Sequence, residues 1–313
     1  MTDAPVTDAP VTGARSVDAR SVDARSVDAP SARDPRLTPA RPDLADIALQ
    51  GSVAAERFVA PEPRRVRVPS APLRRAPRED AGIDTEAVMG EAVRLYEERD
   101  GHAYVQLVRD GYVGYLPAAS LGPAEPAPTH RVRALRTFLY PAPDLKRPNR
   151  GHLGLGAAFA AEGREGDYLR LAGDAYVFAP HCEAAGWREP DYAATAERLV
   201  GTPYLWGGRT SLGLDCSGLV QLALDLAGLP CPRDADQQER GLGRALPLDL
   251  GQLRRGDLVF WRGHVGLMLD AERLIHANGH HMAVAVEPLV VAVARILEKS
   301  YGPVTGLRRL AAS

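Results

Sequence analysis

Cysteine is scarce in this chain of 313 residues, which contains only Cys182, Cys216 and Cys231. So small and odd a set argues against a disulfide framework. A zinc site is not expected either, because no Cys-x-x-Cys pair occurs and the adjacent His280 and His281 would point apart on a strand. We therefore predict neither a metal nor another cofactor.

Two further absences narrow the class of protein. Lysine and arginine number 38 against 40 aspartate and glutamate residues, so no surplus of positive charge indicates a nucleic-acid partner. No apolar stretch approaches the ~20 residues needed to cross a bilayer, and the first residues lack the apolar core of a signal peptide. We expect a cytoplasmic protein with neither a nucleic-acid nor a membrane partner.

Short repeats dominate the first 45 residues. Residues 2–6 recur as residues 7–11, and Ser-Val-Asp-Ala units follow up to about residue 30. Valine is the only larger apolar residue within these repeats, so they cannot form a core, and we predict disorder over residues 1–45. A role as a tether or docking segment and the absence of any role both remain open.

Residues 46–125 contain short runs in which apolar and polar residues alternate, the pattern of half-buried strands. Two Asp-Gly pairs, beginning at Asp100 and Asp110, separate these runs and favour hairpin turns. We predict a small all-β barrel, and residues 111–117 resemble the closing strand of a bacterial SH3-like domain. Residues 126–184 repeat the pattern more faintly and are predicted to form a second SH3-like domain.

The remaining residues, 185–313, change from helices to strands along the sequence. One helix is expected at about residues 192–200, and a second begins at Cys216 and ends before Gly228 and Pro230. Strands are then expected at residues 257–261, 265–269, 273–277, 284–286 and 306–309. Helices followed by an antiparallel sheet predict an α+β fold.

Cys216 is the strongest candidate for a catalytic residue. At the start of a helix capped by Asp215, its thiol lies among free backbone N–H groups at the positive end of the helix dipole. That position favours the thiolate, which is the nucleophilic form. His264 and His276 follow on predicted strands, where they can act as base and orienting group. This is the layout of a cysteine hydrolase.

The length of one turn decides whether the two histidines share a face of the sheet. Side chains alternate between faces along a strand. A three-residue loop at residues 270–272 pairs Leu269 with Arg273 and leaves both histidines on the same face. A two-residue loop would place them on opposite faces. The catalytic arrangement therefore requires the three-residue loop or a bulge.

Six segments of this part of the chain carry recognisable motifs. They are residues 203–208 (Pro-Tyr-Leu-Trp-Gly-Gly), 215–218 (Asp-Cys-Ser-Gly), 232–234, 253–261, 263–266 and 275–277. In this order, over roughly residues 187–313, they resemble the NlpC family of cysteine peptidases, which cut bacterial cell-wall peptides. The resemblance implies a papain-like fold in which the helix that begins at Cys216 packs against an antiparallel sheet.

The resemblance and the chemistry together assign catalytic roles. Cys216 attacks the amide carbonyl, and His264 accepts its proton and later protonates the leaving amine. His276 holds the tautomer of His264, the place that Asp or Asn takes in other triads. The resemblance implies that Tyr204 lies beside the thiol, where its hydroxyl and the Cys216 N–H can support the oxyanion.

Substrate contacts are implied by the resemblance alone. Asp215, with Ser217 beside it, resembles the carboxylate that receives the free amine of the peptide. In relatives with SH3-like domains, a Glu and a Tyr of the first barrel help to cap that amine, and Glu91 and Tyr112 match them best. Ala235 stands where relatives often have serine, which leaves the side-chain preference of the substrate open. The remaining candidates for substrate binding are Trp206, Arg233 and Asp234.

These features predict a cysteine endopeptidase that hydrolyses the γ-D-glutamyl–diamino-acid bond of murein peptides with a free N-terminal L-Ala. Without an export signal it would act on released fragments, in cell-wall peptide recycling. One alternative is an acyltransferase or amidase that uses the same triad. Another is a catalytically silent module that binds wall peptide, although the intact Cys216, His264 and His276 argue against it.

Overall fold

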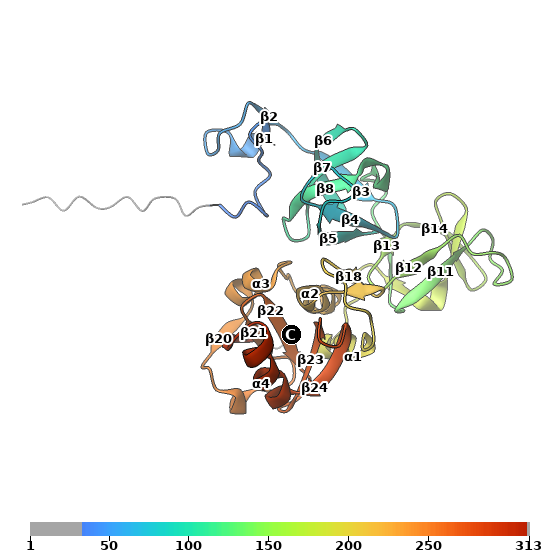
Figure 1. Cartoon of the computed structure of the whole chain (residues 1–313). Coiled ribbons are helices and arrows are strands. Elements are labelled where there is room, and N and C mark those ends of the chain that lie inside the picture. The colour runs from blue at the N-terminus through green and yellow to red at the C-terminus, as the bar shows by residue number, and fades with distance from the viewer. Residues whose placement is uncertain (1–32, 312–313) are drawn as a thin grey trace, which may run out of the picture. The chain divides into compact units, whose positions relative to one another are not determined.

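Residues 33–311 are the part of the chain that the structure, a computed structural model, describes. Those from Asp34 onward belong to one compact unit (Figure 1). Most of the tail predicted at residues 1–45 lies outside the described residues. Residues 34–45, however, are ordered within the compact unit, so the predicted tail extends too far.

Seven strands make up the first β domain, residues 62–123. They are β3 (Glu62–Val66), β4 (Ser70–Arg74), β5 (Ile83–Val88), β6 (Ala92–Arg99), β7 (His102–Leu107), β8 (Val113–Pro117) and β9 (Leu121–Pro123). They form one sheet in the order β5-β4-β8-β7-β6-β3-β9. Asp100 and Gly101 have positive φ angles of 50° and 75° at the turn between β6 and β7, so the predicted hairpin is confirmed there.

The segment that precedes this domain, residues 34–46, is called the N-terminal strap below. It ends in β1 (Leu44–Asp46), which pairs in parallel with β2 (Arg57–Val59). Leu44 is fully buried and packs against Tyr96 and Tyr104 of the first β domain. Burial of leucine contributes about 1.5–3 kcal/mol, so the strap is part of the folded core rather than a loose tail.

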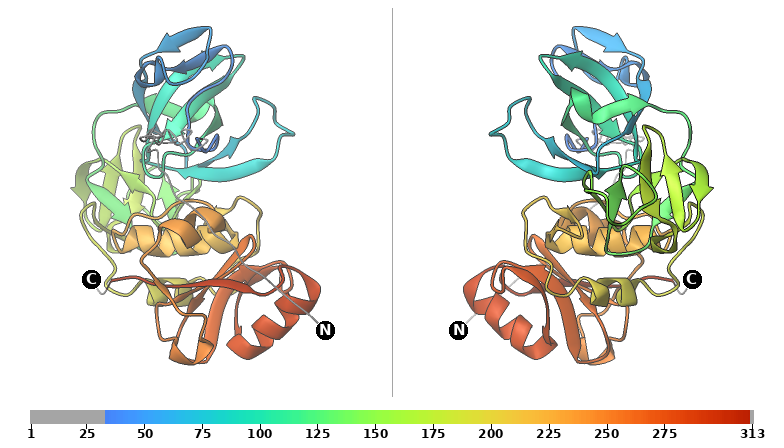
Figure 2. Two further views of the ribbon diagram at one scale, coloured as in Figure 1. Left: turned by 90° about the vertical axis from the view of Figure 1, so that its left-hand side faces the viewer. Right: turned by 90° about the vertical axis from the view of Figure 1, so that its right-hand side faces the viewer.

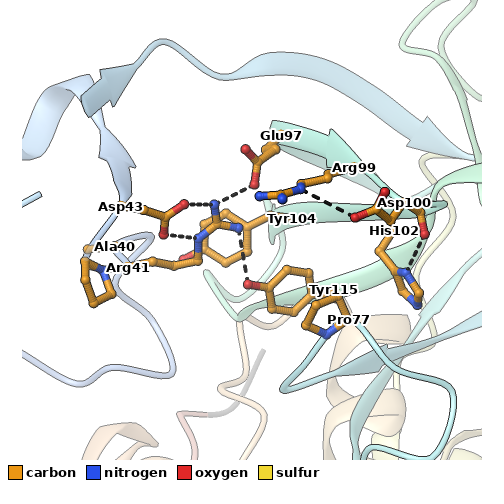
Figure 3. Close-up of a pocket in the computed structure, with 11 residues that line it drawn as sticks. Ala40, Arg41, Asp43, Pro77, Glu97, Arg99, Asp100, His102, Tyr104 and Tyr115 are labelled. Atoms are coloured by element: carbon orange, nitrogen blue, oxygen red, sulfur yellow. Dashed lines mark hydrogen bonds and ion pairs between the residues drawn. The ribbon is translucent and has the colours of Figure 1, made fainter. Parts of the chain in front are cut away.

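Arg41 fastens the middle of the strap to the same domain. Its guanidinium lies 4.6 Å from the centre of the Tyr104 ring, a cation–π arrangement. It also donates hydrogen bonds to Asp43, to Glu97 and to the Tyr115 hydroxyl (Figure 3). These contacts fix the course of the strap over β6, β7 and β8.

Eight strands form the second β domain, residues 130–184. They are β10 (His130–Val132), β11 (Arg136–Tyr140), β12 (His152–Gly154), β13 (Ala158–Phe159), β14 (Ala161–Glu165), β15 (Tyr168–Leu171), β16 (Ala175–Phe178) and β17 (Cys182–Ala184). A five-stranded sheet, β12-β11-β16-β15-β14, and a three-stranded sheet, β13-β10-β17, enclose a core of their own. That residues 126–184 form an SH3-like domain stays a prediction.

The C-terminal domain combines helices with a six-stranded antiparallel sheet in the order β20-β25-β21-β22-β23-β24. The helices are α1 (Tyr192–Arg198), α2 (Cys216–Leu226), α3 (Ala235–Gly241) and α4 (Leu289–Lys299). The strands are β18 (Arg209–Thr210), β19 (Gly213–Leu214), β20 (Arg244–Leu246), β21 (Leu258–Trp261), β22 (His264–Met268), β23 (Arg273–Asn278), β24 (Ala283–Pro288) and β25 (Val304–Arg309). This is an α+β arrangement.

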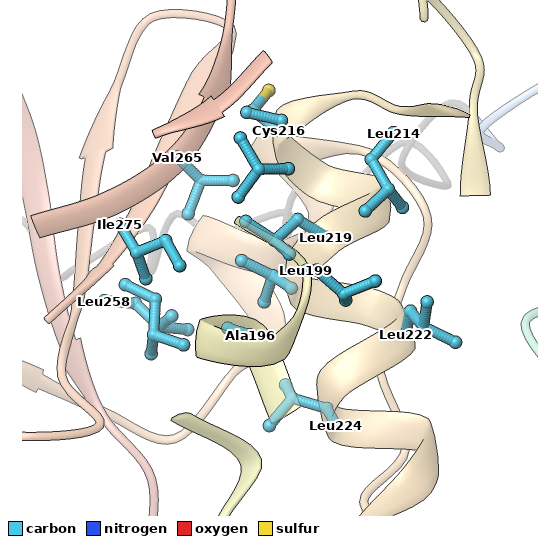
Figure 4. Packing of buried hydrophobic residues seen from close by; sticks show 14 of the residues in the cluster. Ala196, Leu199, Leu214, Cys216, Leu219, Leu222, Leu224, Leu258, Val265 and Ile275 are labelled. Atoms are coloured by element: carbon cyan, nitrogen blue, oxygen red, sulfur yellow. The ribbon is translucent and has the colours of Figure 1, made fainter. Parts of the chain in front are cut away.

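Alternate residues of the central strands face different helices. Leu258, Val265 and Ile275 belong to the apolar cluster built around α2 (Figure 4). Their neighbours Val259 and Leu274 belong to a second cluster, which includes the apolar face of α4. The sheet therefore lies between α2 and α4, with the period-two alternation expected of a strand (Figure 2).

The sequence does not predict α4. Its run of β-branched residues beginning at Val290 resembles a strand. A helix forms because Leu289, Ala292 and Ile296 recur at helical spacing and are all buried against the sheet. Like α2, α4 has 11 residues, and within residues 33–311 no helix has the length and apolar character to cross a bilayer.

Candidate active site

A cavity of about 250 Å³ opens at the start of α2. Its walls come from three parts of the chain. The strap contributes Arg36, and the first β domain contributes Asp84 and Tyr112. The C-terminal domain contributes Tyr204, Trp206, Asp215, Cys216, Ser217, Asp234, Ala235, Asp236 and Gly263. The cavity thus gathers most of the site residues predicted from the sequence.

Cys216 is the first residue of α2, and local packing explains the motif around it. Asp215 is the N-cap, and its side chain accepts a hydrogen bond from the Gly218 N–H at 2.7 Å. A Cβ atom at Gly218 would lie 2.2 Å from the Gly208 carbonyl oxygen, so only glycine fits there. Capping and close packing thereby place the Cys216 sulfur at the cavity.

The two predicted histidines form a hydrogen-bonded chain. His264 Nε2 lies 2.8 Å from His276 Nδ1, and His276 Nε2 lies 2.7 Å from Glu287 Oε1. All three side chains are buried. Because His264 Nε2 is engaged with His276, its Nδ1 is the nitrogen that remains to exchange a proton with a substrate or a thiol.

The register between β22 and β23 agrees with a three-residue loop. Leu267 pairs with Ile275, and the Leu269 N–H donates to the Arg273 carbonyl oxygen at 2.8 Å. The loop prediction is therefore confirmed, and it puts both histidines on the same face of the sheet.

Three partners of the histidines are not predicted by the sequence analysis. Arg295 of α4 donates to Glu287, and the Tyr301 ring stacks on His264 with 5.0 Å between the ring centres. Glu287 lies two residues beyond Ala285, which pairs with His276, and this spacing is the signal that could have revealed it. Arg295 and Tyr301 had no such signal, because the helix that precedes Tyr301 was not predicted.

Two observations place His264 close to the thiol. Val265, the next residue, belongs to the same apolar cluster as Cys216 (Figure 4). Helix α2, which begins at Cys216, also packs against β22, which begins at His264. His264 therefore lies within the immediate surroundings of Cys216.

Burial keeps both reacting groups uncharged at rest. It raises the pKa of Cys216 to about 12, with the Asp215 charge acting in the same direction. It lowers the pKa of His264 to about 3, and the neighbouring His276 adds to this effect. Burial thus acts against the thiolate expected from the helix start.

Asp215 is fully engaged in an internal ion pair. Arg233 donates to its two oxygens at 2.9 and 2.6 Å, and the Gly207 N–H donates to it at 3.0 Å. Ser217 bonds both Asp215 and Arg233. Since Arg233 is only 1% exposed, this pair organises the loop before α2. The geometry does not support the predicted contact of Asp215 with a substrate amine.

Glu91 lies outside the cavity, contrary to its predicted role. Its Oε1 pairs with Arg109 at 3.1 Å and with Arg209 at 2.7 Å. The acidic residue of the first β domain that lines the cavity is Asp84, on β5. Glu91 and Asp84 each lie close to an end of β5. The docking of that strand determines which of the two reaches the cavity.

Strand β5 is held tightly against the loop that precedes α2. A Cβ atom at Gly207, where φ is 77°, would lie 2.7 Å from the Ile83 carbonyl oxygen. On the same strand, the Thr85 hydroxyl accepts a hydrogen bond from Arg233 Nε at 2.7 Å. The Gly-Gly motif and Arg233 therefore hold β5, the strand that carries Asp84, in place beside the cavity.

Asp234 and Tyr112, both predicted for substrate binding, meet in the cavity. The Tyr112 hydroxyl donates to Asp234 Oδ2 at 3.2 Å. Asp234 is also the N-cap of α3. Burial raises the pKa of its carboxyl group despite nearby arginines, so a cation placed beside it is stabilising.

Two aromatic residues complete the cavity. Burial and then the Cys216 charge raise the pKa of Tyr204, so its hydroxyl stays protonated and able to donate a hydrogen bond. Trp206 lines the cavity although it is 67% exposed, which places its ring at the rim.

Two family models match this chain. The model described as "NlpC/P60 family" matches residues 201–293, and the model described as "bacterial dipeptidyl-peptidase Sh3 domain" matches residues 73–121. Among solved structures, an NlpC/P60 family protein from Bacillus cereus has a TM-score of 0.65 at 18% identity, and the match covers 79% of this chain and 99% of that one. At this identity the likeness shows the fold.

Curated relatives point in the same direction. The chain is 40% identical over 84 residues to "Dipeptidyl-peptidase 6" of Lysinibacillus sphaericus, a match over 27% of this chain and 30% of that protein. It is 28% identical over 220 residues to "Gamma-D-glutamyl-L-lysine dipeptidyl-peptidase" of Bacillus subtilis, over 63% of this chain and 73% of that protein.

A cysteine at a helix start, served by histidines on an antiparallel sheet, defines a papain-like cysteine peptidase domain. With the matches above, residues 201–293 form a domain of the NlpC/P60 family, and residues 73–121 match an SH3 domain of the bacterial dipeptidyl-peptidase type. The resemblance expected from the sequence motifs is thus confirmed.

Proposed function

We propose that this protein is a cysteine endopeptidase that hydrolyses the γ-D-glutamyl–diamino-acid bond of murein peptides beginning with a free L-Ala. One observation carries the proposal. Cys216 shares a cavity of about 250 Å³ with the carboxylates of Asp84 and Asp234 and the hydroxyl of Tyr112. A nucleophile and an acidic wall in so small a volume suit a short peptide that ends in an ammonium group.

The names of relatives support the same substrate class. Proteins from Bacillus subtilis and Bacillus cereus, at 28% and 30% identity, are both named gamma-D-glutamyl-L-lysine dipeptidyl-peptidase. A dipeptidyl-peptidase cuts after the second residue from a free N-terminus. Carboxylates at one end of the cavity would hold the terminal amine and so fix which peptide bond lies at the thiol.

The proposed reaction starts from the neutral thiol and imidazole. His264 takes the thiol proton as the Cys216 sulfur attacks the carbonyl carbon, and it passes that proton to the departing amine when the C–N bond breaks. Water then loses a proton to His264, attacks the thioester and releases the acid and the free thiol. Glu287, acting through His276, stabilises the transient imidazolium, and the Tyr204 hydroxyl supports the oxyanion.

A role in cell-wall peptide recycling inside the cell is part of the proposal. A site that reads the amine of L-Ala requires fragments from which the sugar has already been removed. Lysine in the relatives' names makes L-Ala-γ-D-Glu-L-Lys the first substrate to test, with the diaminopimelate peptide beside it.

The test is incubation with both tripeptides, with their N-acetylated forms and with intact sacculi, followed by mass spectrometry. We expect L-Ala-γ-D-Glu and the free diamino acid as products, and a loss of at least ~10²-fold in kcat/KM on N-acetylation. Ligated products formed with an added amine would instead favour the acyltransferase. Equal cleavage of blocked peptides or of sacculi would rule out the recycling role.

Substitutions locate the amine contact. Asp234→Asn should lower kcat/KM for the free tripeptide more than for its acetylated form, because the lost charge is the one that faces the ammonium. Asp80→Asn is the matched control, since this aspartate is 78% exposed and does not line the cavity. If both variants discriminate as the unmodified protein does, Asp234 is not the amine contact.

A further inference from the structure

Arg36 of the N-terminal strap lies against the acidic wall of the cavity, the side formed by Asp234 and Asp236. Its Nη1 lies 2.7 Å from Asp234 Oδ2 and 2.9 Å from Asp236 Oδ1, and its Nη2 lies 2.8 Å from Asp236 Oδ2. Nη2 and Nε also donate to Asp34. All five N–H donors of the guanidinium are therefore satisfied by three carboxylates.

The strap holds this guanidinium in place from the side of the first β domain. The Val113 N–H donates to the Arg36 carbonyl oxygen at 2.8 Å, and the Gln106 side chain donates to the next carbonyl, that of Leu37, at 3.1 Å. The backbone of residue 36 is thus fixed beside Tyr112, whose hydroxyl shares Asp234 Oδ2 with Arg36.

We propose that Arg36 is a specificity-determining residue that acts as an internal competitor: it fills the cation-binding position of the cavity, and the ammonium group of a substrate must displace it from Asp234. The inference rests on the proposed function only in naming that ammonium as the rival. It assigns to the strap a role that neither the family models nor the relatives' names contain.

Charge and exposure both support a displaceable contact. The hydrogen bonds from Arg36 and Arg240 hold the pKa of Asp236 at about 2 against the effect of burial, with Arg36 the larger contributor, so the wall is ionised and attracts cations. The Arg36 side chain is 33% exposed, and that of Asp234 is 24% exposed. At this exposure, water and salt reach the ion pair between Arg36 and Asp234 and screen it, so an incoming ammonium group can compete for Asp234.

Competition has a measurable consequence for affinity. A ligand that binds only when Arg36 has left has an apparent Kd equal to its intrinsic Kd divided by the fraction of molecules with an open site. If Arg36 occupies the wall about nine-tenths of the time, its removal should tighten binding of an amine about tenfold. A peptide without the amine gains nothing at Asp234.

The experiment measures binding without turnover. In the Cys216→Ala background, calorimetry compares Arg36→Gln with the parent for L-Ala-γ-D-Glu-L-Lys and for its N-acetylated form. We expect about tenfold tighter binding of the free tripeptide in Arg36→Gln and no change for the acetylated one. Added salt should narrow the difference, because it loosens the Arg36 contact in the parent.

Arg78→Gln is the matched control for the loss of one positive charge, since Arg78 is 68% exposed and lies outside the cavity. Unchanged, weaker or undetectable binding of the free tripeptide by Arg36→Gln would overturn the inference and would show Arg36 to be a support of the wall. This result leaves the proposed function intact if the active protein cleaves the tripeptide. Tighter binding without any cleavage by the active protein would sustain the inference and overturn the proposed reaction.

Discussion

The proton chain of the site is the series of hydrogen bonds from His264 through His276 to Glu287. Arg295 donates a further hydrogen bond to Glu287. Burial on its own would raise the pKa of Glu287, but the hydrogen bond from His276 and the charge of Arg295 hold it below its ordinary value. A carboxylate that stays charged inside the protein can balance the imidazolium that forms during catalysis. The neutral resting pair therefore has its counter-charge already in place.

The low pKa of His264 predicts an unusual response to acid. Its pKa falls from 6.5 to about 3 because of burial, so the imidazole remains an unprotonated base throughout that interval. We expect kcat at saturating tripeptide to be nearly constant from about pH 7.5 to pH 5. An acid limb in kcat with a midpoint near 6.5 would contradict this assignment of the base.

Substitution along the chain should give graded losses. His264→Ala should lower kcat by roughly 10²–10⁴-fold, because the group that carries the proton is removed. His276→Ala should cost less, and Glu287→Gln less again, since these residues act on the reaction through His264. Steady-state kinetics on the tripeptide, with melting temperatures to exclude misfolding, gives the order. Full activity of His276→Ala would show that the second histidine is not needed.

The residues that carry chemistry could be predicted from the sequence better than those that line the rest of the cavity. Cys216 and the two histidines stand in local motifs whose packing reasons are visible, such as the capping Asp215 and the glycine at 218. Asp84 and Arg36 could not be found, because they reach the cavity only through the docking of β5 and of the strap. Chain segments far apart in sequence decide that docking.

At the level of single elements, the start of α2 packs so closely on the preceding loop that residue 218 has no room for a side chain. This helix was predicted correctly from the capping residue and the apolar run, whereas no element was predicted at α4, where a helical spacing of buried residues lies within a run of valines. Burial of the Leu289 face against the sheet, which is a tertiary effect, overrides the local preference of valine for strands. The five strands expected in this domain, β21 to β25, were predicted to within a few residues, whereas β18, β19, β20 and α3 were not predicted.

Gly218→Ala tests the contact at the start of α2. The new Cβ atom would lie 2.2 Å from the Gly208 carbonyl oxygen, so the helix or the loop must shift. We expect a loss of about 1–3 kcal/mol in the free energy of unfolding, measured by denaturant titration. Gly186→Ala is the control, because no atom lies within 4 Å of the position that its Cβ atom would take, and it should change stability little. Equal stability of the two variants would refute the packing argument.

At the scale of the whole molecule, the strap joins the first β domain to the C-terminal domain. Leu44 and Arg41 anchor it on the β domain, and Arg36 reaches α3 through Asp236. The prediction of a tail to residue 45 failed because the repeats before residue 31 dominate its composition. Two leucines further along, Leu37 and Leu44, belong to cores of the first β domain.

Removal of residues 1–45 should therefore destabilise the protein. The loss of Leu44 burial alone predicts a decrease of about 2 kcal/mol in the free energy of unfolding. A variant that lacks only residues 1–32 keeps the strap and serves as the reference. Thermal unfolding of the two should differ by several degrees, and coincident melting curves would show that the strap adds nothing to stability.

The composition of the cavity wall has a consequence for how proteins of this kind diverge. Arg36, Asp84 and Tyr112 are encoded well before the first residue of the peptidase domain, yet they line the cavity that holds Cys216. A single change in the strap or in β5 can alter which peptides are accepted while every residue of the proton chain stays the same. Classification by the catalytic domain alone would then group enzymes that accept different peptides. Comparison of the N-terminal segments would be needed to trace how these substrate preferences changed.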